Sequence, residues 1–251
     1  MAERGGNSHL KKEIVITDLT RMYYGNVCIA GYDREYKCIR PILKEGGISE
    51  KDCFVGEKPI LFPFAVIELD LLSPSNQMPH TEDYFIEKNS IKYLRKAKNP
   101  ENMLQKTLFE QVADIFGQEI HDDLGFYVLE NKGDRSLGTI QPRGIHTVKY
   151  EKDIRGNWDY RLSFYDIGDK YFRLKITDLT WQYFCRSQRS KGQTPTGISE
   201  FATRVLKSSR VYLRIGLSRG WDKFPDRCYL QINGIYTFPD YLNGKTFLDY
   251  K

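Results

Sequence analysis

One pentapeptide occurs twice in this chain, and the two copies set the strongest constraint on the fold. Ile-Thr-Asp-Leu-Thr stands at residues 16–20 and again at 176–180, an offset of 160 residues. Each copy ends a run of strand type, and each is followed at the same distance by two aromatic residues. Self-similarity of this kind indicates a duplicated module. The alternative is that each copy is only a strand running into a turn, where Thr and Asp are common.

The composition is that of a globular chain with an unusual share of aromatic side chains. Of 251 residues, 40% are hydrophobic and 28% are charged, which excludes wholesale disorder. Seventeen Tyr, fourteen Phe and three Trp exceed what two small cores usually require, and the polar tip of Tyr suits a surface. The net charge of +5 permits a phosphate-bearing partner without requiring one.

The cysteine pattern and the lack of long apolar runs predict the cellular compartment of the protein. The five cysteines form no CxxC pair and none stands near a His at zinc-finger spacing, so we expect reduced thiols. The first residues carry no apolar export signal, and no run approaches the roughly eighteen apolar residues of a membrane span. We therefore expect a cytoplasmic protein with no membrane partner.

The order of strand and helix signals predicts two β-rich modules. Strand patterns at 14–19, 26–32, 37–42 and 64–72 precede a helical insert within 89–117, which Asn99 is expected to cap. In the second half we expect a strand at 170–179, a polar loop at 185–195, a helix capped by Thr196, and a strand at 227–232 closed by Asn233-Gly234. The predicted division is a disordered N-terminus (1–10), a first module with the helical insert (11–165) and a second module (166–251).

Strands with an inserted helix are the elements of a small five-stranded barrel of the OB type. The predicted fold is therefore mostly β with inserted helices (α+β), in which two tandem OB-like barrels pack together. Such barrels usually hold oligonucleotides, because aromatic rings stack on bases while Lys and Arg contact the backbone. Candidate contacts of these types are Tyr23, Tyr24, Arg40, Arg143, Trp181, Tyr183, Arg214, Arg219, Trp221 and Lys223.

The segment 79–85 has the most suggestive chemistry in the sequence. His80, Glu82 and Asp83 could supply metal ligands or acid and base groups. One His beside two acids is neither a complete metal triad nor a complete nucleophile set, and the same residues are typical of a polar turn. Neither the G-x-G-x-x-G nor the P-loop pattern occurs. We therefore predict no catalytic residue, no metal and no cofactor.

Five segments of the chain carry a family resemblance. They are the first ITDLT copy, Gly31-Tyr32-Asp33 with Cys38-Ile39-Arg40-Pro41, residues 79–83, residues 214–219 and residues 231–242. Together they resemble the prokaryotic dual OB-domain family over nearly the whole chain. The resemblance implies two tandem OB folds and a role in conflict or antiphage systems, for which nucleic-acid sensing has been proposed. It brings no catalytic residues, and it marks Arg40, His80, Glu82, Asp83, Arg214 and Arg219 as candidate ligand contacts.

The leading hypothesis is a nucleic-acid-binding accessory or sensor protein of a prokaryotic defence system. In this hypothesis the two barrels form one composite surface that contacts DNA or RNA through its backbone and by stacking, and a protein from the same system can be a further partner. One alternative is a metal-dependent enzyme acting on nucleic acid or a nucleotide. Another is a protein-interaction scaffold subunit.

Overall fold

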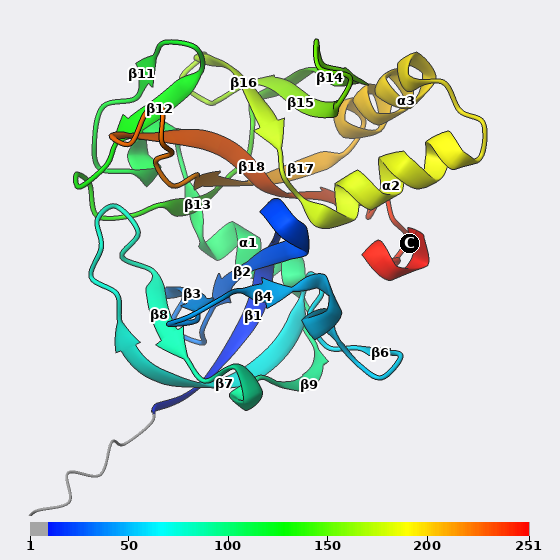
Figure 1. Cartoon of the computed structure of the whole chain (residues 1–251). Helices are drawn as coiled ribbons and strands as arrows, with labels where there is room; N and C mark the ends of the chain where they lie inside the picture. Colours follow the sequence, from blue (N-terminus) through cyan, green and yellow to red (C-terminus); the bar gives the residue numbers. More distant parts are fainter. Residues whose placement is uncertain (1–9, 251) are drawn as a thin grey trace, which may run out of the picture.

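The computed structural model describes residues 10–250, and its strands form two barrels stacked one on the other (Figure 1). The predicted disordered N-terminus lies outside the described residues except for Leu10, which begins β1 (Leu10–Arg21). None of the helices within residues 10–250 has the length and the apolar run needed to cross a bilayer.

The first barrel is closed and has the strand order of an OB fold. Its strands are β1, β2 (Asn26–Tyr32), β3 (Cys38–Ile42), β7 (Ala65–Pro74) and β8 (Asp83–Ile86). They run in the order β1–β2–β3–β8–β7, with β3 and β8 parallel, and β7 pairs back onto β1. The four strands predicted for this region are therefore confirmed. The smaller elements around them are η1 (Tyr23–Gly25), β4 (Ile48–Ser49), η2 (Glu50–Cys53), β5 (Phe54–Val55), β6 (Lys58–Pro59), η3 (Lys88–Ser90) and β9 (Lys92–Lys96).

The second barrel repeats this strand order but is partly open. Its strands are β14 (Gly144–Lys152), β15 (Trp158–Tyr165), β16 (Tyr171–Ile176), β17 (Arg210–Leu217) and β18 (Arg227–Phe238). They run β14–β15–β16–β18–β17, and again the third and fifth are parallel. In place of β14, β17 pairs with β13 (Leu137–Ile140). The smaller elements before β13 are α1 (Pro100–Lys106), β10 (Leu108–Phe109), η4 (Ala113–Ile115), β11 (His121–Asp122) and β12 (Phe126–Leu129).

Because the second barrel is partly open, one edge of β14 has no strand partner within residues 10–250. Helix α3 (Pro195–Lys207) covers this edge. The backbone N–H of Val148 donates to Thr203 Oγ1 at 2.8 Å, and that of Tyr150 donates to Ser199 Oγ at 2.9 Å. An uncovered strand edge would invite pairing with another chain. The helix hydroxyls satisfy part of this edge instead.

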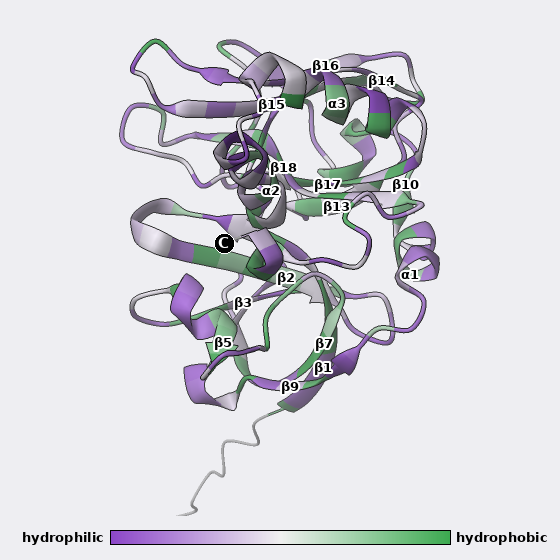
Figure 2. Cartoon of the chain, turned by 90° about the vertical axis from the view of Figure 1, so that its right-hand side faces the viewer, coloured by the Kyte–Doolittle hydropathy of each residue, from purple (hydrophilic) through white to green (hydrophobic). Residues whose placement is uncertain are grey.

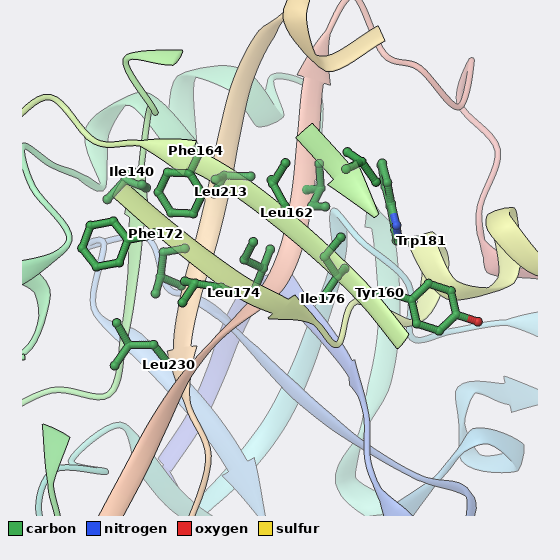
Figure 3. Close-up of a cluster of buried hydrophobic side chains, with 14 of the residues drawn as sticks. Ile140, Tyr160, Leu162, Phe164, Phe172, Leu174, Ile176, Trp181, Leu213 and Leu230 are labelled. Carbon is green, nitrogen blue, oxygen red and sulfur yellow. The ribbon is translucent and has the colours of Figure 1, made fainter. Parts of the chain in front are cut away.

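Each barrel has its own apolar core, and helix α2 (Leu179–Ser190) contributes to both. Trp181 packs in the core of the second barrel, whereas Leu179 and Tyr183 pack in that of the first, together with Phe247 from η5 (Phe247–Tyr250). Figure 2 shows hydrophobic and hydrophilic residues alternating along the strands, as expected for barrel walls with one buried face. Figure 3 shows inward side chains of β15 and β16 gathered with those of β17 and β18.

The two sheets divide the chain between β9 and β10, and not at residue 165. β15 and β16 lie on either side of that predicted boundary, yet they pair with each other from Arg161↔Lys175 to Tyr165↔Tyr171. The last strands of the predicted first module, β14 and β15, therefore belong to the second barrel. The predicted boundary falls inside the β15–β16 hairpin, because the second pentapeptide ends a strand and does not begin a barrel.

The two pentapeptides are not equivalent positions of a repeat. The first lies inside β1, the first strand of its barrel. In the second copy Ile176 ends β16, the third strand, and Asp178 accepts a hydrogen bond from Trp181 N at 3.1 Å as the N-cap of α2. The copies instead touch each other, because Thr20 and Asp178 form an isolated antiparallel bridge, next to which Arg21 N donates to Thr177 O at 2.9 Å. The tandem OB-like architecture is right, although the sequence feature that suggested it is not its internal repeat.

Four local predictions are corrected by the structure. Within residues 89–117 the only α-helix is α1, which Asn99 caps as expected, and Lys92, Arg95 and Lys96 before it lie on β9. Residues 185–190 belong to α2 and not to a loop, and Thr194, not Thr196, caps α3. Strand β18 continues through Asn233-Gly234 to Phe238, with a register shift opposite that pair.

Candidate nucleic-acid interface

The outer face of the first barrel is covered by the second barrel, and Arg214 of β17 lies at the centre of this contact. Its side chain is 0% exposed. Its Nε donates to Asp18 Oδ2 at 2.9 Å, and Nη1 donates to Thr139 Oγ1 at 2.8 Å and to the Tyr32 hydroxyl. The guanidinium carbon also lies 4.7 Å from the centroid of the Tyr32 ring. In OB barrels the second and third strands usually form the ligand face, and here a neighbouring arginine occupies it.

A second ion pair between the barrels joins the buried Asp83 to Arg219 at the rim. Asp83 of β8 is 0% exposed and pairs through one oxygen with Arg40 of β3 and through the other with Arg219. Arg219 follows β17 of the second barrel, and its side chain remains 40% exposed while it donates to Gln77 Oε1 at 3.1 Å. The carboxylate of Asp83 is thus fully engaged by protein cations.

The other two candidate contacts of the 79–83 segment, Glu82 and His80, also have structural partners. Glu82 Oε1 accepts hydrogen bonds from the backbone N–H groups of Ser136 and Leu137 at 2.8 and 3.1 Å, and Oε2 accepts one from Ser136 Oγ at 2.8 Å. These bonds hold the start of β13 against the first barrel. His80 is 0% exposed, and its Nε2 lies 3.9 Å from Cys228 Sγ. Within residues 10–250 no three His, Cys, Asp or Glu side chains group as metal ligands.

Burial makes His80 a source of acid sensitivity. Burial, followed by repulsion from Arg40 and Arg219, lowers the pKa of its imidazole from 6.5 to about 2. Below about pH 6.5 the unfolded chain takes up a proton at this position and the folded protein does not, so stability falls as the pH drops. Between pH 7 and 5 we expect His80 to account for a loss of about 2 kcal/mol in the free energy of unfolding. Urea unfolding of the wild type and of His80→Gln at both pH values measures it.

The control for this experiment is His146→Gln, which replaces an exposed histidine. It should lose as much stability between pH 7 and 5 as the wild type, whereas His80→Gln should lose about 2 kcal/mol less. Equal losses in all three proteins would show that the buried imidazole does not control the acid response.

Several predicted contact residues are therefore inaccessible at the surface. Arg40, His80, Glu82, Asp83 and Arg214 lie buried between the barrels, with Arg219 at the rim. Trp181 and Tyr183 are 1% and 7% exposed because they are the core-facing residues of α2 and not loop residues.

In the second barrel, the outer face of β14–β16 corresponds to the covered β1–β3 face of the first barrel. This face is open to solvent and basic. Along β16 exposed and buried residues alternate, so Tyr171, Arg173 and Lys175 point outward. Strand pairing sets Lys149, Arg161 and Lys175 in one row across β14, β15 and β16. We call the outward residues Lys149, Arg161, Tyr165, Tyr171, Arg173 and Lys175 the β14–β16 face.

Aromatic rings lie at one end of the β14–β16 face. Tyr165 and Tyr171 are 39% and 40% exposed, and their ring centroids lie 5.3 Å apart. The exposed imidazole of His146 meets both rings edge to face, at 6.5 and 6.0 Å. The predicted contact Arg143 is here too, because its backbone N–H donates to Tyr165 O at 2.9 Å. Exposed rings beside guanidinium groups can stack on bases while the cations contact phosphates.

Carboxylates accompany these cations, but the pairs are exposed. Glu151 lies 4.0 Å from Lys149 Nζ and 3.7 Å from Arg173 Nη2, and Asp159 pairs with Arg161 Nε at 2.6 Å. Ion pairs of this exposure are worth about 0–1 kcal/mol. A phosphate group can therefore replace the carboxylate as the partner of each cation.

The four remaining candidates are exposed and lie on two turns. Tyr23 and Tyr24 are 86% and 101% exposed on η1, close in the chain to Arg21, which is bonded to Thr177 beyond the end of β16. Trp221 is 52% exposed in the turn after β17 and contacts Phe224 edge to face at 5.6 Å, with the exposed Lys223 beside it.

The sequence reasoning missed the residues of the β14–β16 face. Their signal was present as strict alternation in Tyr-Phe-Arg-Leu-Lys-Ile at 171–176, where every second residue is polar or carries a polar tip. The sequence prediction instead chose the polar residues of segment 79–83 and Arg214, which lie in the buried contact between the barrels.

The fold and this surface define a class of protein, a tandem OB-fold protein in which one barrel caps the ligand face of the other and leaves its own face free. The sequence matches the family described as the dual OB-containing domain over residues 12–235, and the chain belongs to that family. A comparison with curated proteins found no match.

Proposed function

We propose that this protein binds nucleic acid through the β14–β16 face of its second barrel. The observation that carries the proposal is the exposed row of Lys149, Arg161 and Lys175 beside the Tyr165–Tyr171 pair. Cations spaced along a sheet attract a phosphate backbone, and aromatic rings accept any base, so a single strand is the favoured ligand. The first barrel serves as a rigid support, because the arginines of the second barrel occupy its face.

The spread of exposed candidates favours a strand longer than the sheet itself. Arg143 lies beside one end of the face, and the Tyr23–Tyr24 turn lies near the β16 residues at the other. Membership of the dual OB-containing domain family supports a ligand held on a barrel face. The resemblance to conflict-system proteins supports placing this binding in a prokaryotic defence role. The free thiols of Cys28, Cys38, Cys185 and Cys228 suit the reducing cytoplasm.

The enzyme alternative has less support. The carboxylates of Glu82 and Asp83 already accept hydrogen bonds or pair with arginines, and His80 is buried with a strongly lowered pKa. A metal ion at this position would have to displace the contacts that join the barrels.

Fluorescence anisotropy with labelled single-stranded DNA, single-stranded RNA and duplex DNA tests the proposed function. We expect single strands to bind more tightly than duplex, and the logarithm of the binding constant to fall linearly with the logarithm of the salt concentration. A slope of about −2 to −3 corresponds to the three or four cations of the β14–β16 face, at about 0.7 per phosphate contact. Absence of binding at low salt, or binding that salt does not weaken, would contradict the proposal.

A further inference from the structure

A small cavity lies at the junction of the two barrels, away from the β14–β16 face. Its volume is about 110 Å³. Its walls come from the residues before β7, the end of β9, the first residue of α1, the start of α2, the end of β18 and the segment that follows β18. These parts of the chain meet where the second pentapeptide begins α2.

Two hydroxyl groups in this cavity are buried without a partner. Thr180 is 2% exposed, and its Oγ1 has no hydrogen-bond partner within residues 10–250. The hydroxyl of Tyr241 is likewise shielded from solvent and unpaired in the described part of the chain. Both residues line the cavity. A buried polar group without a hydrogen bond costs about 1–3 kcal/mol, so a ligand that satisfies both hydroxyls has a ready source of binding energy.

Asp178 is a further polar residue of the cavity. It is 3% exposed, and burial raises the pKa of its carboxyl to about 7. Its oxygens accept hydrogen bonds from Trp181 N at 3.1 Å and Ile235 N at 3.0 Å. Each carboxyl oxygen can accept a further hydrogen bond, so the carboxyl adds an acceptor to the two hydroxyls.

The other walls are aromatic, and one of them has a strained backbone. The rings of Phe64 and Tyr236 lie 4.5 Å apart between centroids, and both line the cavity. Phe64 has a φ of +66°, in the left-handed region that a bulky residue rarely adopts. Hydrogen bonds from Phe64 N to Ile16 O at 2.7 Å and from Ala97 N to Phe64 O at 2.8 Å hold it there. Strain of this kind is concentrated at ligand sites.

Two lysines give the cavity a positive rim. Lys96 and Lys245 line it and are exposed. Asp240 also lines the cavity, but within residues 10–250 it forms no ion pair with either lysine, and its two oxygens accept the backbone N–H groups of Leu242 and Gly244 at 2.9 and 2.7 Å. A ligand whose uncharged planar ring lies inside the cavity can therefore place an anionic group beside Lys96 and Lys245 at the rim.

We propose that this cavity binds a nucleoside monophosphate group, with the base inside and the phosphate at Lys96 and Lys245. A base has the planar apolar faces that suit Phe64 and Tyr236, and a polar edge that can meet Thr180 and Tyr241. Both hydroxyls can donate or accept, so they adapt to the edge that is presented. The volume suits one base and leaves the sugar and phosphate outside. This site does not depend on the nucleic-acid interface of the second barrel.

Isothermal titration calorimetry with AMP, GMP, CMP and UMP, each at concentrations up to millimolar, tests the site. We expect saturable binding of at least one of them, and about tenfold weaker binding by the double variant Thr180→Val/Tyr241→Phe. Because neither hydroxyl has a partner in the protein alone, this variant should melt at or above the wild-type temperature. The matched control Thr196→Val/Tyr36→Phe removes the same groups at exposed positions and should bind as the wild type does.

Two results would overturn the inference. One is the absence of saturable binding for all four monophosphates, and the other is binding that the Thr180→Val/Tyr241→Phe variant leaves unchanged. Oligonucleotide binding is measured separately, so either site can fail without the other. Displacement of the bound monophosphate by a short 5′-phosphorylated oligonucleotide would support a strand end as the natural source of the group, and resistance to displacement would support a free nucleotide.

Discussion

Replacing Arg214 by Met is expected to lower the free energy of unfolding by about 3–5 kcal/mol, because it leaves the Asp18 carboxylate buried without its cation. Asp18 is 1% exposed, and among its described contacts only the Thr17 hydroxyl, which donates to Oδ2 at 2.9 Å, would remain as a side-chain donor. Small domains are stable by only about 5–15 kcal/mol, so this loss is a large fraction of the total. Urea unfolding followed by circular dichroism measures it.

Two further variants show whether the effect comes from the buried pair. Arg143→Met breaks an exposed ion pair with Asp169 and should cost less than about 1 kcal/mol. The double variant Asp18→Leu/Arg214→Met removes both charges and should recover much of the loss, since apolar side chains of similar volume can replace a buried pair. If Arg214→Met unfolds within about 1 kcal/mol of the wild type, the pair does not hold the barrels together.

Removing three cations from the β14–β16 face is expected to weaken single-strand binding about a hundredfold at low salt, because each lost phosphate contact costs roughly 1 kcal/mol. The variant is Arg161→Ala/Arg173→Ala/Lys175→Ala. Losing three contacts should also reduce the salt slope by about 2. The three side chains are partly or fully exposed and pair only weakly, so the fold should persist.

The matched control is Lys44→Ala/Lys51→Ala/Lys98→Ala, which removes the same net charge from exposed positions outside the face. It should leave the affinity within about threefold of the wild type, since only the long-range attraction changes. Equal losses in the two triple variants would mean that total charge, and not this face, determines binding.

The sequence predicted the architecture better than it predicted the site. Strand signals in the first barrel were strong because apolar and polar residues alternate there and turns separate the runs, and β2 begins and ends at the predicted residues. The identical pentapeptides show the limit of local reasoning. The same five residues continue a strand in one copy and cap a helix in the other, because the surrounding tertiary contacts differ.

The site residues could not be predicted because their exposure depends on how the barrels dock. Arg214 and Arg173 are both arginines on strands, yet one is fully buried and the other is 45% exposed. The sequence of β17 does not indicate that Arg214 will pair with Asp18, which lies almost two hundred residues earlier in the chain. The alternation of exposed and buried residues along β16 could be predicted from the sequence. Which side of the barrel remains exposed to solvent depends on how the two barrels pack together.

The most direct test of the β14–β16 interface is ultraviolet cross-linking of a single-stranded oligonucleotide to the intact protein, followed by mass spectrometry of the peptides. We expect cross-links at Tyr165 and Tyr171 or their neighbours on β15 and β16, where exposed rings lie beside the cations. Cross-links confined to the first barrel, with none on these two strands, would contradict it.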